Sequence, residues 1–451
     1  MADHFDVVVV GARVAGCAVA THLARWGLSV CMVDRARFPS DTLSTHIFQD
    51  LPRLQRLGVL DRLLATGAPP ISEILMQIDD VDLSQKHADL AVLSVRRTLL
   101  DEILVDNAIE AGVEVRTHTA VKGVVWDSGR VTGVVANNGS AEVEISGRVI
   151  IGADGRNSAV ARAVSARRYN VTESERSAVW AYYEGVEASP TIHFCRQGSD
   201  AFIACPADSG LFLVIVGPSR IDLPKYRDGG AGFDEAIATY APIAKLVDGA
   251  RRVRHPIVVA RWQGYLRESA GRGWALVGDA GHFKDPTPGQ GISDALRQAE
   301  ALAAAIAEGL DEGAMDNHLQ RWWRWRDADA LEKYWWAQDL GRGGEVTPLL
   351  KEILRKIGRD PQAVRELHEV FFHLRRPSKV LTPARLLGAA RSLLFQQPMY
   401  ASEVLAEVGS VIALDRQRKR LGRYPDYEAR PEKPGPELSE EDKIGSHLVG
   451  I

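Results

Sequence analysis

The N-terminal stretch of the chain combines two short apolar runs with a segment of small residues between them. Residues 5–10, FDVVVV, form a β-branched run that is typical of a strand buried on both faces of a sheet. Residues 17–26, CAVATHLARW, predict a helix, and Gly27 follows at the position of a C-cap. Residues 28–33 predict a second buried strand, so the order of elements indicates a β-α-β unit.

The turn between the first strand and the helix reads GARVAG over residues 11–16, close to the pattern G-x-G-x-x-G of dinucleotide-binding turns. Gly11 permits a tight turn, Gly16 permits close contact between helix and strand, and the helix N-terminus offers N–H groups to a pyrophosphate. Arg13 stands where the middle glycine is expected, and its guanidinium would add positive charge beside a pyrophosphate. The alternative is a β-α-β unit without a ligand.

Acidic residues follow predicted strands at two places. Asp34 ends the second strand, at the position where an acid holds a ribose hydroxyl in a dinucleotide-binding unit. Residues 149–164, VIIGADGRNSAVARAV, repeat the order strand, turn and helix. Asp154 in that turn would accept hydrogen bonds from a ligand or from the turn itself, and Asn157 or Ser158 would cap the helix.

Residues 273–306 carry the densest pattern of glycine and proline. A predicted strand over residues 274–277 leads into the sequence GDA, and a loop with two prolines precedes GQG at the start of a long Ala-rich helix. Asp279 is placed to accept from a sugar hydroxyl, and the N–H groups at the helix start suit a phosphate or an electron-rich ring edge. Residues 95–115 predict an amphipathic helix and a short strand, with Arg96 or Arg97 at the helix start either facing the turn or solvated.

The order of these motifs resembles that of the FAD-dependent oxidoreductases with the p-hydroxybenzoate hydroxylase fold. The motifs are G-x-x-x-x-G with an acid after strand two, then R-x-x-L-D, A-D-G, and G-D-A followed by P-x-x-G-Q-G. The resemblance covers residues 5 to about 310. It implies an α/β fold, with a Rossmann-like FAD-binding domain, an antiparallel β-sheet substrate domain and a C-terminal helical region.

The resemblance also implies which residues hold FAD. The pyrophosphate would lie at residues 11–16, Asp34 would bind the adenosine ribose, and Arg35 would lie near the adenine. Arg97 and Asp279 would approach the ribityl chain, Asp154 belongs to a motif associated with both FAD and NAD(P)H, and residues 286–292 would lie along the isoalloxazine. The complete set of expected cofactor residues is Gly11, Ala12, Arg13, Val14, Ala15, Gly16, Asp34, Arg35, Arg97, Asp154, Gly278, Asp279, Pro286, Gly289, Gln290, Gly291 and Ile292.

The patterns divide the chain into five parts. We expect the FAD-binding domain in residues 1–168 and 269–310, the substrate domain in 169–268, a helical region in 311–424 and a Pro- and charge-rich tail in 425–451. Side chains of the substrate domain that are candidates for the wall of the substrate pocket are Tyr182, Tyr183, His193 and Phe194.

A stretch of tryptophans lies in the expected helical region. Trp322, Trp325, Trp336 and the tryptophans beside them predict a helix buried on more than one side, and core packing is favoured over the wall of an aromatic pocket.

Composition and charge narrow the range of partners. A net charge of −4 gives no argument for nucleic acid or an anionic membrane. No apolar run is long enough for a membrane span, and none follows a basic stretch as in a signal peptide. Cys17, Cys31, Cys195 and Cys205 lack the spacing of a metal site and favour a reduced, cytoplasmic setting. We therefore expect no metal and no nucleic-acid partner, and the resemblance implies a small-molecule substrate, aromatic or isoprenoid.

The resemblance implies a monooxygenase that uses FAD, NAD(P)H and molecular oxygen to hydroxylate an electron-rich aromatic or polycyclic molecule through a flavin C4a-hydroperoxide. No second Rossmann unit is visible for NAD(P)H, which in hydroxylases of this fold binds transiently across the A-D-G region. His46 and His282 are candidates for a base that ionises a phenol, and a structural hydrogen bond is the alternative for each.

Other activities remain open. The sequences HFKDP and FPSDTLSTH resemble a branch between hydroxylases and reductases, so reduction of isoprenoid double bonds, as in geranylgeranyl reductases, is the main alternative. A flavin halogenase would be expected to carry W-x-W-x-I-P, whereas the nearest string, WWRWRD, has no Ile-Pro. A non-catalytic nucleotide-binding module is the remaining alternative.

Overall fold

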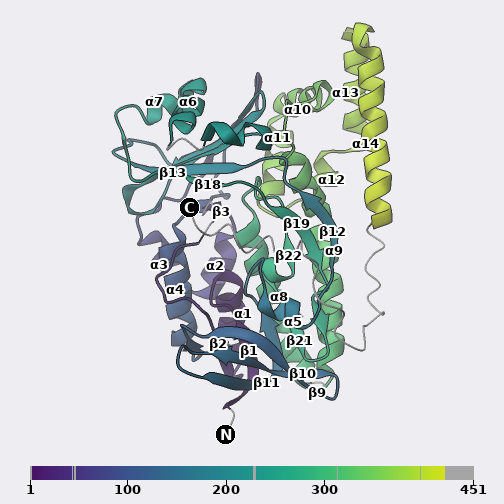
Figure 1. Ribbon diagram of the computed structural model, residues 1–451. Helices are drawn as coiled ribbons and strands as arrows, with labels where there is room; N and C mark the ends of the chain where they lie inside the picture. The colour runs from purple at the N-terminus through teal and green to yellow at the C-terminus, as the bar shows by residue number, and fades with distance from the viewer. Residues whose placement is uncertain are drawn as a thin grey trace.

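The computed structural model describes residues 3–42, 44, 47–226, 230–311, 313–396 and 398–421. One large sheet lies near the N-terminus and a second lies at the far end of the molecule, with long helices between and beside them (Figure 1). His46 and residues 425–451, for which the sequence suggested a base and a loose tail, lie outside the described residues.

The first sheet has the order β20-β21-β11-β1-β2-β8, and β10 and β9 extend it from β11. Its strands are β1 (Asp3–Val10), β2 (Val30–Val33), β8 (Glu114–Arg116), β9 (Ala120–Asp127), β10 (Arg130–Asn137), β11 (Glu142–Gly152), β20 (Ala270–Gly271) and β21 (Trp274–Leu276). Strands β21, β11, β1, β2 and β8 run parallel to one another, whereas β20 and β10 pair antiparallel with β21 and β11. This is the parallel arrangement of a Rossmann-like domain.

Burial on both faces explains the continuous apolar run of β1. Val7 and Val9 pack into a core with the helices α1 (Val14–Arg25), α4 (Arg97–Glu110) and α8 (Gly291–Asp311). Val8 and Val10 face the other side, where they pack with residues of β10, β21 and the short helix α5 (Ala159–Ala163). A strand covered on both faces needs no polar alternation, because neither face meets water.

The second sheet has the order β17-β13-β16-β15-β14-β4-β5, with β18 beside β13 and β6 beside β4. Its strands are β4 (Glu73–Ile78), β5 (Val81–Asp82), β6 (Gln85–Lys86), β13 (Ala178–Glu184), β14 (Thr191–Gln197), β15 (Asp200–Pro206), β16 (Phe212–Gly217), β17 (Arg251–Arg252) and β18 (Ile257–Val259). It is antiparallel except for the β4–β14 pair, which is parallel. Since β4–β6 come from residues 73–86, the chain visits this sheet before it reaches residue 169.

Smaller elements connect the two sheets. A three-stranded sheet contains β12 (Arg168–Glu173), β19 (Gln263–Arg267) and β22 (His282–Phe283), and β3 (Ile47–Phe48) pairs with β7 (Leu93–Ser94). The other helices before α8 are α2 (Leu51–Leu57), α3 (Leu60–Leu64), α6 (Ala231–Thr239) and α7 (Ala241–Leu246).

The C-terminal part of the described chain is helical, as expected. It comprises α9 (Met315–Leu340), α10 (Pro348–Gly358), α11 (Pro361–Phe371), α12 (Pro377–Val380), α13 (Pro383–Gln396) and α14 (Ala401–Leu421), and α14 stands at one edge of the molecule (Figure 1). Trp322, Trp323 and Trp336 of α9 are buried in the cores, which confirms their packing role. Trp335 is half-buried, and Trp325 is 36% exposed on the outer face of α9 beneath the guanidinium of Arg297.

Two boundaries differ from the sequence-based expectation. Helix α1 begins at Val14 instead of residue 17, because Arg13 is its extended N-cap residue and the turn is shorter than the glycine pattern suggested. Strand β2 begins at Val30 instead of residue 28, since Leu28 still closes the helix by donating from its N–H to the Leu23 carbonyl.

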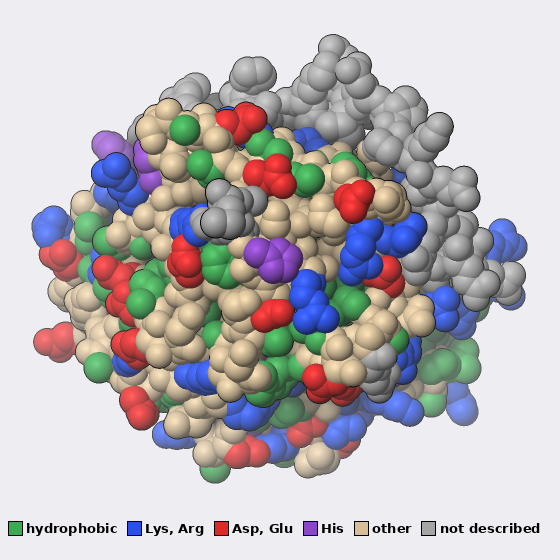
Figure 2. Space-filling model, turned by 90° about the horizontal axis from the view of Figure 1, so that it is seen from below, with side chains coloured by type: hydrophobic (Ala, Val, Ile, Leu, Met, Phe, Trp, Pro, Cys, Tyr) green, Lys and Arg blue, Asp and Glu red, His purple; other side chains and the backbone are tan. Residues whose placement is uncertain are grey.

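The surface shows no segregation of charge on the face below the first sheet. Figure 2 shows acidic and basic side chains interspersed there with apolar ones. Among the described helices, none has the length and apolar character needed to cross a membrane.

Candidate active site

The turn after β1 is built around two glycines that no other residue can replace. Gly11 has a φ of +106°, and a Cβ on it would lie 2.5 Å from the carbonyl oxygen of Ala153. A Cβ on Gly16 would lie only 1.7 Å from the carbonyl oxygen of Gly11. The turn, the start of α1 and the A-D-G segment after β11 are therefore in direct contact.

Arg13 occupies this turn without strain and directs its side chain away from it. Its φ of −109° and ψ of −166° are extended, so the position needs no glycine. The guanidinium pairs with Asp101 of α4, and its Nη2 donates to Ser40 Oγ at 3.0 Å. Arg97 donates to the same buried carboxylate, from Nε to Oδ1 at 2.9 Å. The two arginines thus share one acid, so these three side chains together carry one net positive charge.

Asp34 lies at the end of β2, where the sequence placed it. Its Oδ2 accepts from the N–H of Ala12 at 2.7 Å, and its Oδ1 accepts from the N–H of Ala36 at 2.7 Å. The carboxylate therefore closes the turn of residues 11–16, here called the fingerprint turn, and still has lone pairs for a hydroxyl group. Arg35 follows with an exposed side chain.

The two carboxylate oxygens of Asp154 have different surroundings. Oδ2 accepts from the N–H of Ala159 at 2.6 Å. The Ser158 hydroxyl accepts from the N–H of Ala161, so Ser158, and not Asn157, caps α5. Oδ1 is buried and has no hydrogen-bond partner within the described chain. Burial raises the pKa of this carboxyl group, and a hydroxyl donor bound at Oδ1 would oppose that rise.

Asp279 follows β21, and the residue before it lies against α1 although the two segments are far apart in the sequence. Gly278 has a φ of +62°, and a Cβ on it would lie 2.8 Å from the Cβ of Ala15 in α1. Burial raises the pKa of the Asp279 carboxyl group, and the positive charges of Arg156 and Arg97 oppose that rise. The backbone carbonyl of Asp279 accepts from the hydroxyl of Tyr265 at 2.6 Å.

The segment from Lys284 to Ile292 is held by buried polar side chains that reach α8 and α11. Lys284 pairs with Asp294 at 2.7 Å and donates to Gln290 Oε1 at 2.6 Å, and all three side chains are buried. Gln290 Nε2 donates to the carbonyl oxygens of Val370 and Phe371, so this side chain anchors the loop to α11. Gly289 has a φ of +67°, and no atom lies within 4 Å of the position where a Cβ on Gly291 would point.

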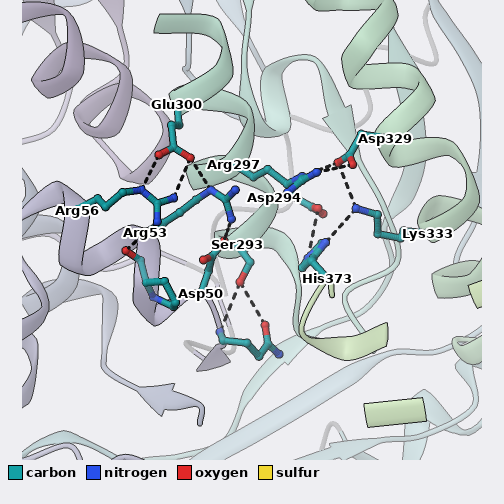
Figure 3. A network of polar contacts seen from close by, with 12 residues as sticks. Asp50, Arg53, Arg56, Ser293, Asp294, Arg297, Glu300, Asp329, Lys333 and His373 are labelled. Carbon is teal, nitrogen blue, oxygen red and sulfur yellow. Dashed lines mark hydrogen bonds and ion pairs between the residues drawn. The ribbon is translucent and has the colours of Figure 1, made fainter. Parts of the chain in front are cut away.

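Further contacts fix α8 behind this loop (Figure 3). Ser293 bonds to Gln49, Glu300 pairs with Arg53 and Arg56 of α2, and Arg297 pairs with Asp329 of α9. Lys333 donates to Asp329 and to His373 Nδ1. Burial holds the pKa of His373 far below its ordinary value, so its neutral ring can accept this bond. The N-terminus of α8 is thus tied to α2, α9 and the segment after α11.

An apolar cavity lies between the second sheet, the loop of residues 286–289 and the end of α11. The space within it that is open to the centre of a water-sized sphere is about 90 Å³. Side chains of β4, β14, β15 and β16 form one wall, and Phe371 and Phe372 form another. Its lining residues with polar side chains, among those the structure describes, are Gln49, Arg176, Ser177, Trp262, Thr287 and His368.

The sequence predicted few of the residues that line this cavity. Phe194 lines the cavity, whereas Tyr183 points to the opposite face of the sheet and packs against α6. Tyr182 and His193 are not among the described residues that line it. Arg176, Trp262 and His368 were missed, because they lie in unrelated segments and carry no local motif.

The two histidine candidates for a base do not gain support here. His46 is outside the described residues, and His282 is not among the described residues that line the cavity. Burial and neighbouring cations hold the pKa of His282 well below its ordinary value, and its Nδ1 contacts Gln298 Nε2 at 3.2 Å. His368 does line the cavity; burial and His87 lower its pKa to about 4, and its Nδ1 lies 2.8 Å from His87 Nε2.

Known proteins share this architecture over most of the chain. The chain is 24% identical over 377 residues to a 1H-pyrrole-2-carbonyl-[peptidyl-carrier protein] brominase from Pseudoalteromonas luteoviolacea, covering 78% of this chain and 91% of that protein. It is 26% identical to digeranylgeranylglycerophospholipid reductase 1 from Methanococcoides burtonii, covering 71% and 80% respectively. The crystal structure of p-nitrophenol 4-monooxygenase PnpA from Pseudomonas putida aligns with a TM-score of 0.69 at 19% identity, covering 84% of this chain and all of that one.

The family assignment rests on a match to the family as a whole. The model of the FAD binding domain family matches residues 4–331, which include the fingerprint turn, the A-D-G segment and the loop before α8. Convergence of these segments in the structure agrees with that match. The chain therefore belongs to the FAD binding domain family and is an FAD-dependent oxidoreductase.

Proposed function

We propose that this protein is a monooxygenase that uses FAD, NAD(P)H and molecular oxygen to hydroxylate an electron-rich aromatic or polycyclic molecule. The observation that carries the proposal is the position of the apolar cavity. Pro286, Pro288 and Gly289 line it, and these residues belong to the loop that leads into the glycines before α8. A cofactor ring along this loop would lie at the cavity.

The residues present fit FAD on two observations. The unpartnered Oδ1 of Asp154 is a buried acceptor for a hydroxyl or amide donor. Gly291 faces open space at the start of α8, where N–H groups have no partners within the helix. We assign the turn of residues 11–16 to the pyrophosphate, Asp34 to the adenosine ribose and Asp279 to the ribityl chain.

Water exclusion is the main contribution of the chain to the chemistry. Bound FAD would supply redox chemistry, taking electrons from NAD(P)H and passing them to oxygen. The aliphatic and aromatic wall keeps water from the reacting atoms, which suppresses loss of reduced oxygen species to solvent. The buried Lys284–Asp294 pair holds the loop rigid beside the substrate.

NAD(P)H is assigned a transient position near Asp154. Within the described residues, the parallel β-α-β arrangement belongs to the first sheet, and its fingerprint turn is the site assigned to FAD. A nicotinamide cofactor would therefore approach across the A-D-G segment.

A reductase of isoprenoid double bonds is the second candidate, favoured by the aliphatic part of the wall. Ile74, Met76, Ile192, Ile203 and Ile215 would suit a branched hydrocarbon chain as well as an aromatic ring. The similarity to a digeranylgeranylglycerophospholipid reductase gives this candidate further support.

The two candidates differ in their need for oxygen. The purified FAD-loaded protein is incubated with NADPH or NADH and a panel of phenols, indoles, polyketides and isoprenoids, in ¹⁸O₂ and in its absence. We expect one ¹⁸O atom in the product and consumption of equal amounts of O₂ and reduced nicotinamide.

Three results would reject the monooxygenase. Anaerobic conversion to a product with two more hydrogens would establish the reductase. A product that forms only with added bromide or chloride would indicate a halogenase. Failure of the protein to retain flavin after reconstitution would point to a module without catalysis.

A further inference from the structure

Trp262 lines the cavity beside the loop of residues 286–289. It directly precedes β19 and is 6% exposed. Its backbone N–H donates to Ser174 Oγ at 3.0 Å, and its carbonyl oxygen accepts from the Ser174 N–H at 3.0 Å. Two hydrogen bonds to one neighbour therefore fix the backbone that carries the indole ring.

The indole ring is held at its other end by Asp285. Trp262 Nε1 donates to Asp285 Oδ2 at 3.0 Å, and the Asp285 side chain is buried. A buried donor that loses its acceptor costs about 1–3 kcal/mol. Because the backbone and Nε1 are both held, the ring cannot turn out of the wall without that cost.

The same carboxylate also holds the loop beside the ring. Asp285 Oδ1 accepts from the Thr287 N–H at 2.9 Å and from the Thr287 hydroxyl at 2.5 Å, and Thr287 lines the cavity too. The carboxylate packs against Gly341 at the C-terminal end of α9, where a Cβ would overlap it. Asp285 therefore joins two residues of the wall, Trp262 and Thr287, into one fixed corner.

The cavity beside this corner is small. Its space of about 90 Å³ is well below the roughly 300–1,000 Å³ of pockets for drug-sized molecules. Among the described lining residues, Trp262 has the largest side chain. A larger ligand would have to displace part of the wall, and at this corner the hydrogen bonds of Trp262 oppose the displacement.

We propose that Trp262 is the specificity-determining residue that limits the size of the substrate, and that Asp285 is the residue that positions it. The cavity then takes an aromatic molecule of one ring or two fused rings and excludes larger polycyclic molecules. The inference rests on the proposed function, because it takes the cavity as the substrate site, and it narrows the substrate class of that function.

The first test compares two ligands that differ by one fused ring. Equilibrium dialysis measures binding of 2-naphthol and 9-phenanthrol to the FAD-loaded wild type and to Trp262→Leu. Trp322→Leu is the matched control, because it also removes a buried indole with a hydrogen-bonded Nε1, and Trp322 is not among the described residues that line the cavity.

We expect the wild type to bind 2-naphthol at least about tenfold more tightly than 9-phenanthrol, as size discrimination in an apolar pocket allows. Trp262→Leu should bind 9-phenanthrol at least as tightly as 2-naphthol, because the space of the indole becomes available. Trp322→Leu should keep the wild-type preference.

The second test concerns the positioning by Asp285. The protein is labelled with 5-fluorotryptophan, and the ¹⁹F resonances of Trp262 and Trp322 are identified by their absence from the two leucine variants. In Asp285→Leu, which offers no acceptor, the resonance of Trp262 should shift and broaden while that of Trp322 stays unchanged. The preference for 2-naphthol should weaken in the same variant.

Several results would overturn the proposal. Equal binding of both ligands to the wild type would do so, as would binding of neither. An equal loss of both ligands in Trp262→Leu would show that Trp262 has only a structural role. An unchanged Trp262 resonance and an unchanged preference in Asp285→Leu would remove the role of Asp285, and the first test stands without this variant if it does not fold.

The proposal and the monooxygenase assignment fail in different experiments. Binding of the two ligands needs no turnover, so the size preference is measured whether the enzyme oxygenates, reduces or halogenates its substrate. A product without ¹⁸O would reject the monooxygenase and leave the role of Trp262 intact.

Discussion

Arg13 shows how a single side chain can depart from a glycine pattern without changing the turn. Its backbone is extended, so it requires no positive φ, and its side chain leaves the turn to share Asp101 with Arg97. Gly11 and Gly16 have no such freedom, because each would place a Cβ against a backbone carbonyl. For a single residue of this turn, the space around its Cβ decides whether a substitution is tolerated, and agreement with the glycine pattern does not.

Gly16→Ala should therefore damage both stability and cofactor binding. The new Cβ would meet the Gly11 carbonyl oxygen at 1.7 Å, so the turn must open. We expect a loss of about 1–3 kcal/mol in the free energy of unfolding, typical of overpacking, and at least a tenfold weaker affinity for FAD. Chemical denaturation and the flavin content of the purified protein measure these two effects.

Gly123→Ala is the control for this substitution. No atom lies within 4 Å of the position of its Cβ, and Gly123 has no positive φ, so stability and flavin content should match the wild type. Full flavin content in Gly16→Ala would contradict the assignment of this turn to the pyrophosphate.

Helix α8 is the element that joins the proposed cofactor region to the cavity. Its first turn follows the loop that lines the cavity, and its sides pair with α2 and α9 (Figure 3). The buried Lys284–Asp294 pair lies at its start, where it closes the loop onto the helix. Breaking such a pair leaves an uncompensated buried charge, which is far more costly than the loss of an exposed ion pair.

Lys284→Met should lower the free energy of unfolding by about 3–5 kcal/mol at pH 7. Burial acts to raise the pKa of Asp294, but the positive charges of Lys284 and Lys333 contribute to bringing it below its ordinary value. The wild-type pair thus contributes stability above the pKa of an unfolded aspartate, and that contribution fades as the pH falls through the lower folded value. Without Lys284 the pKa of Asp294 should rise, so the variant should be less impaired at pH 5 than at pH 7.

Thermal unfolding at both pH values, with Lys284→Met/Asp294→Asn as the second variant, checks this prediction. Neutralising the acid should restore part of the lost stability at pH 7. A double variant as unstable as the single one would show that the lysine acts through packing and not through its charge.

The whole molecule brings together segments that lie far apart in the sequence. Residues near Gly11, Ala153 and Gly278 contact one another, so the proposed cofactor region is complete only when the first sheet has formed. The second sheet then covers the loop beside it and forms the cavity. Binding of FAD should therefore stabilise the native state as a unit.

Free FAD at 100 times its dissociation constant should stabilise the folded protein by about 2.7 kcal/mol over the apoprotein. The melting temperature of the apoprotein should accordingly rise with FAD concentration, as followed by differential scanning calorimetry. Gly16→Ala should show a smaller rise at the same concentration. A melting temperature that does not respond to FAD would contradict the placement of the cofactor across these converging segments.

Local patterns predicted most elements and only part of the site. The strands, the helix after Gly11 and the cap at Ser158 follow from periodicity and capping chemistry, which act over a few residues. The cavity wall could not be predicted in the same way. Its side chains come from β4, β14, β15 and β16 and from α11, and strand pairing alone decides which of them face inward.

By itself, the sequence determined the elements of the FAD-binding fold and the positions of its glycine and acid motifs, because those features depend on backbone sterics and short-range hydrogen bonds. Tertiary structure alone decided that Arg13 shares Asp101 with Arg97, that β4 joins the second sheet, and that Asp285 holds Trp262 in the wall of the cavity. These outcomes depend on contacts between residues far apart in the chain, which no local pattern encodes.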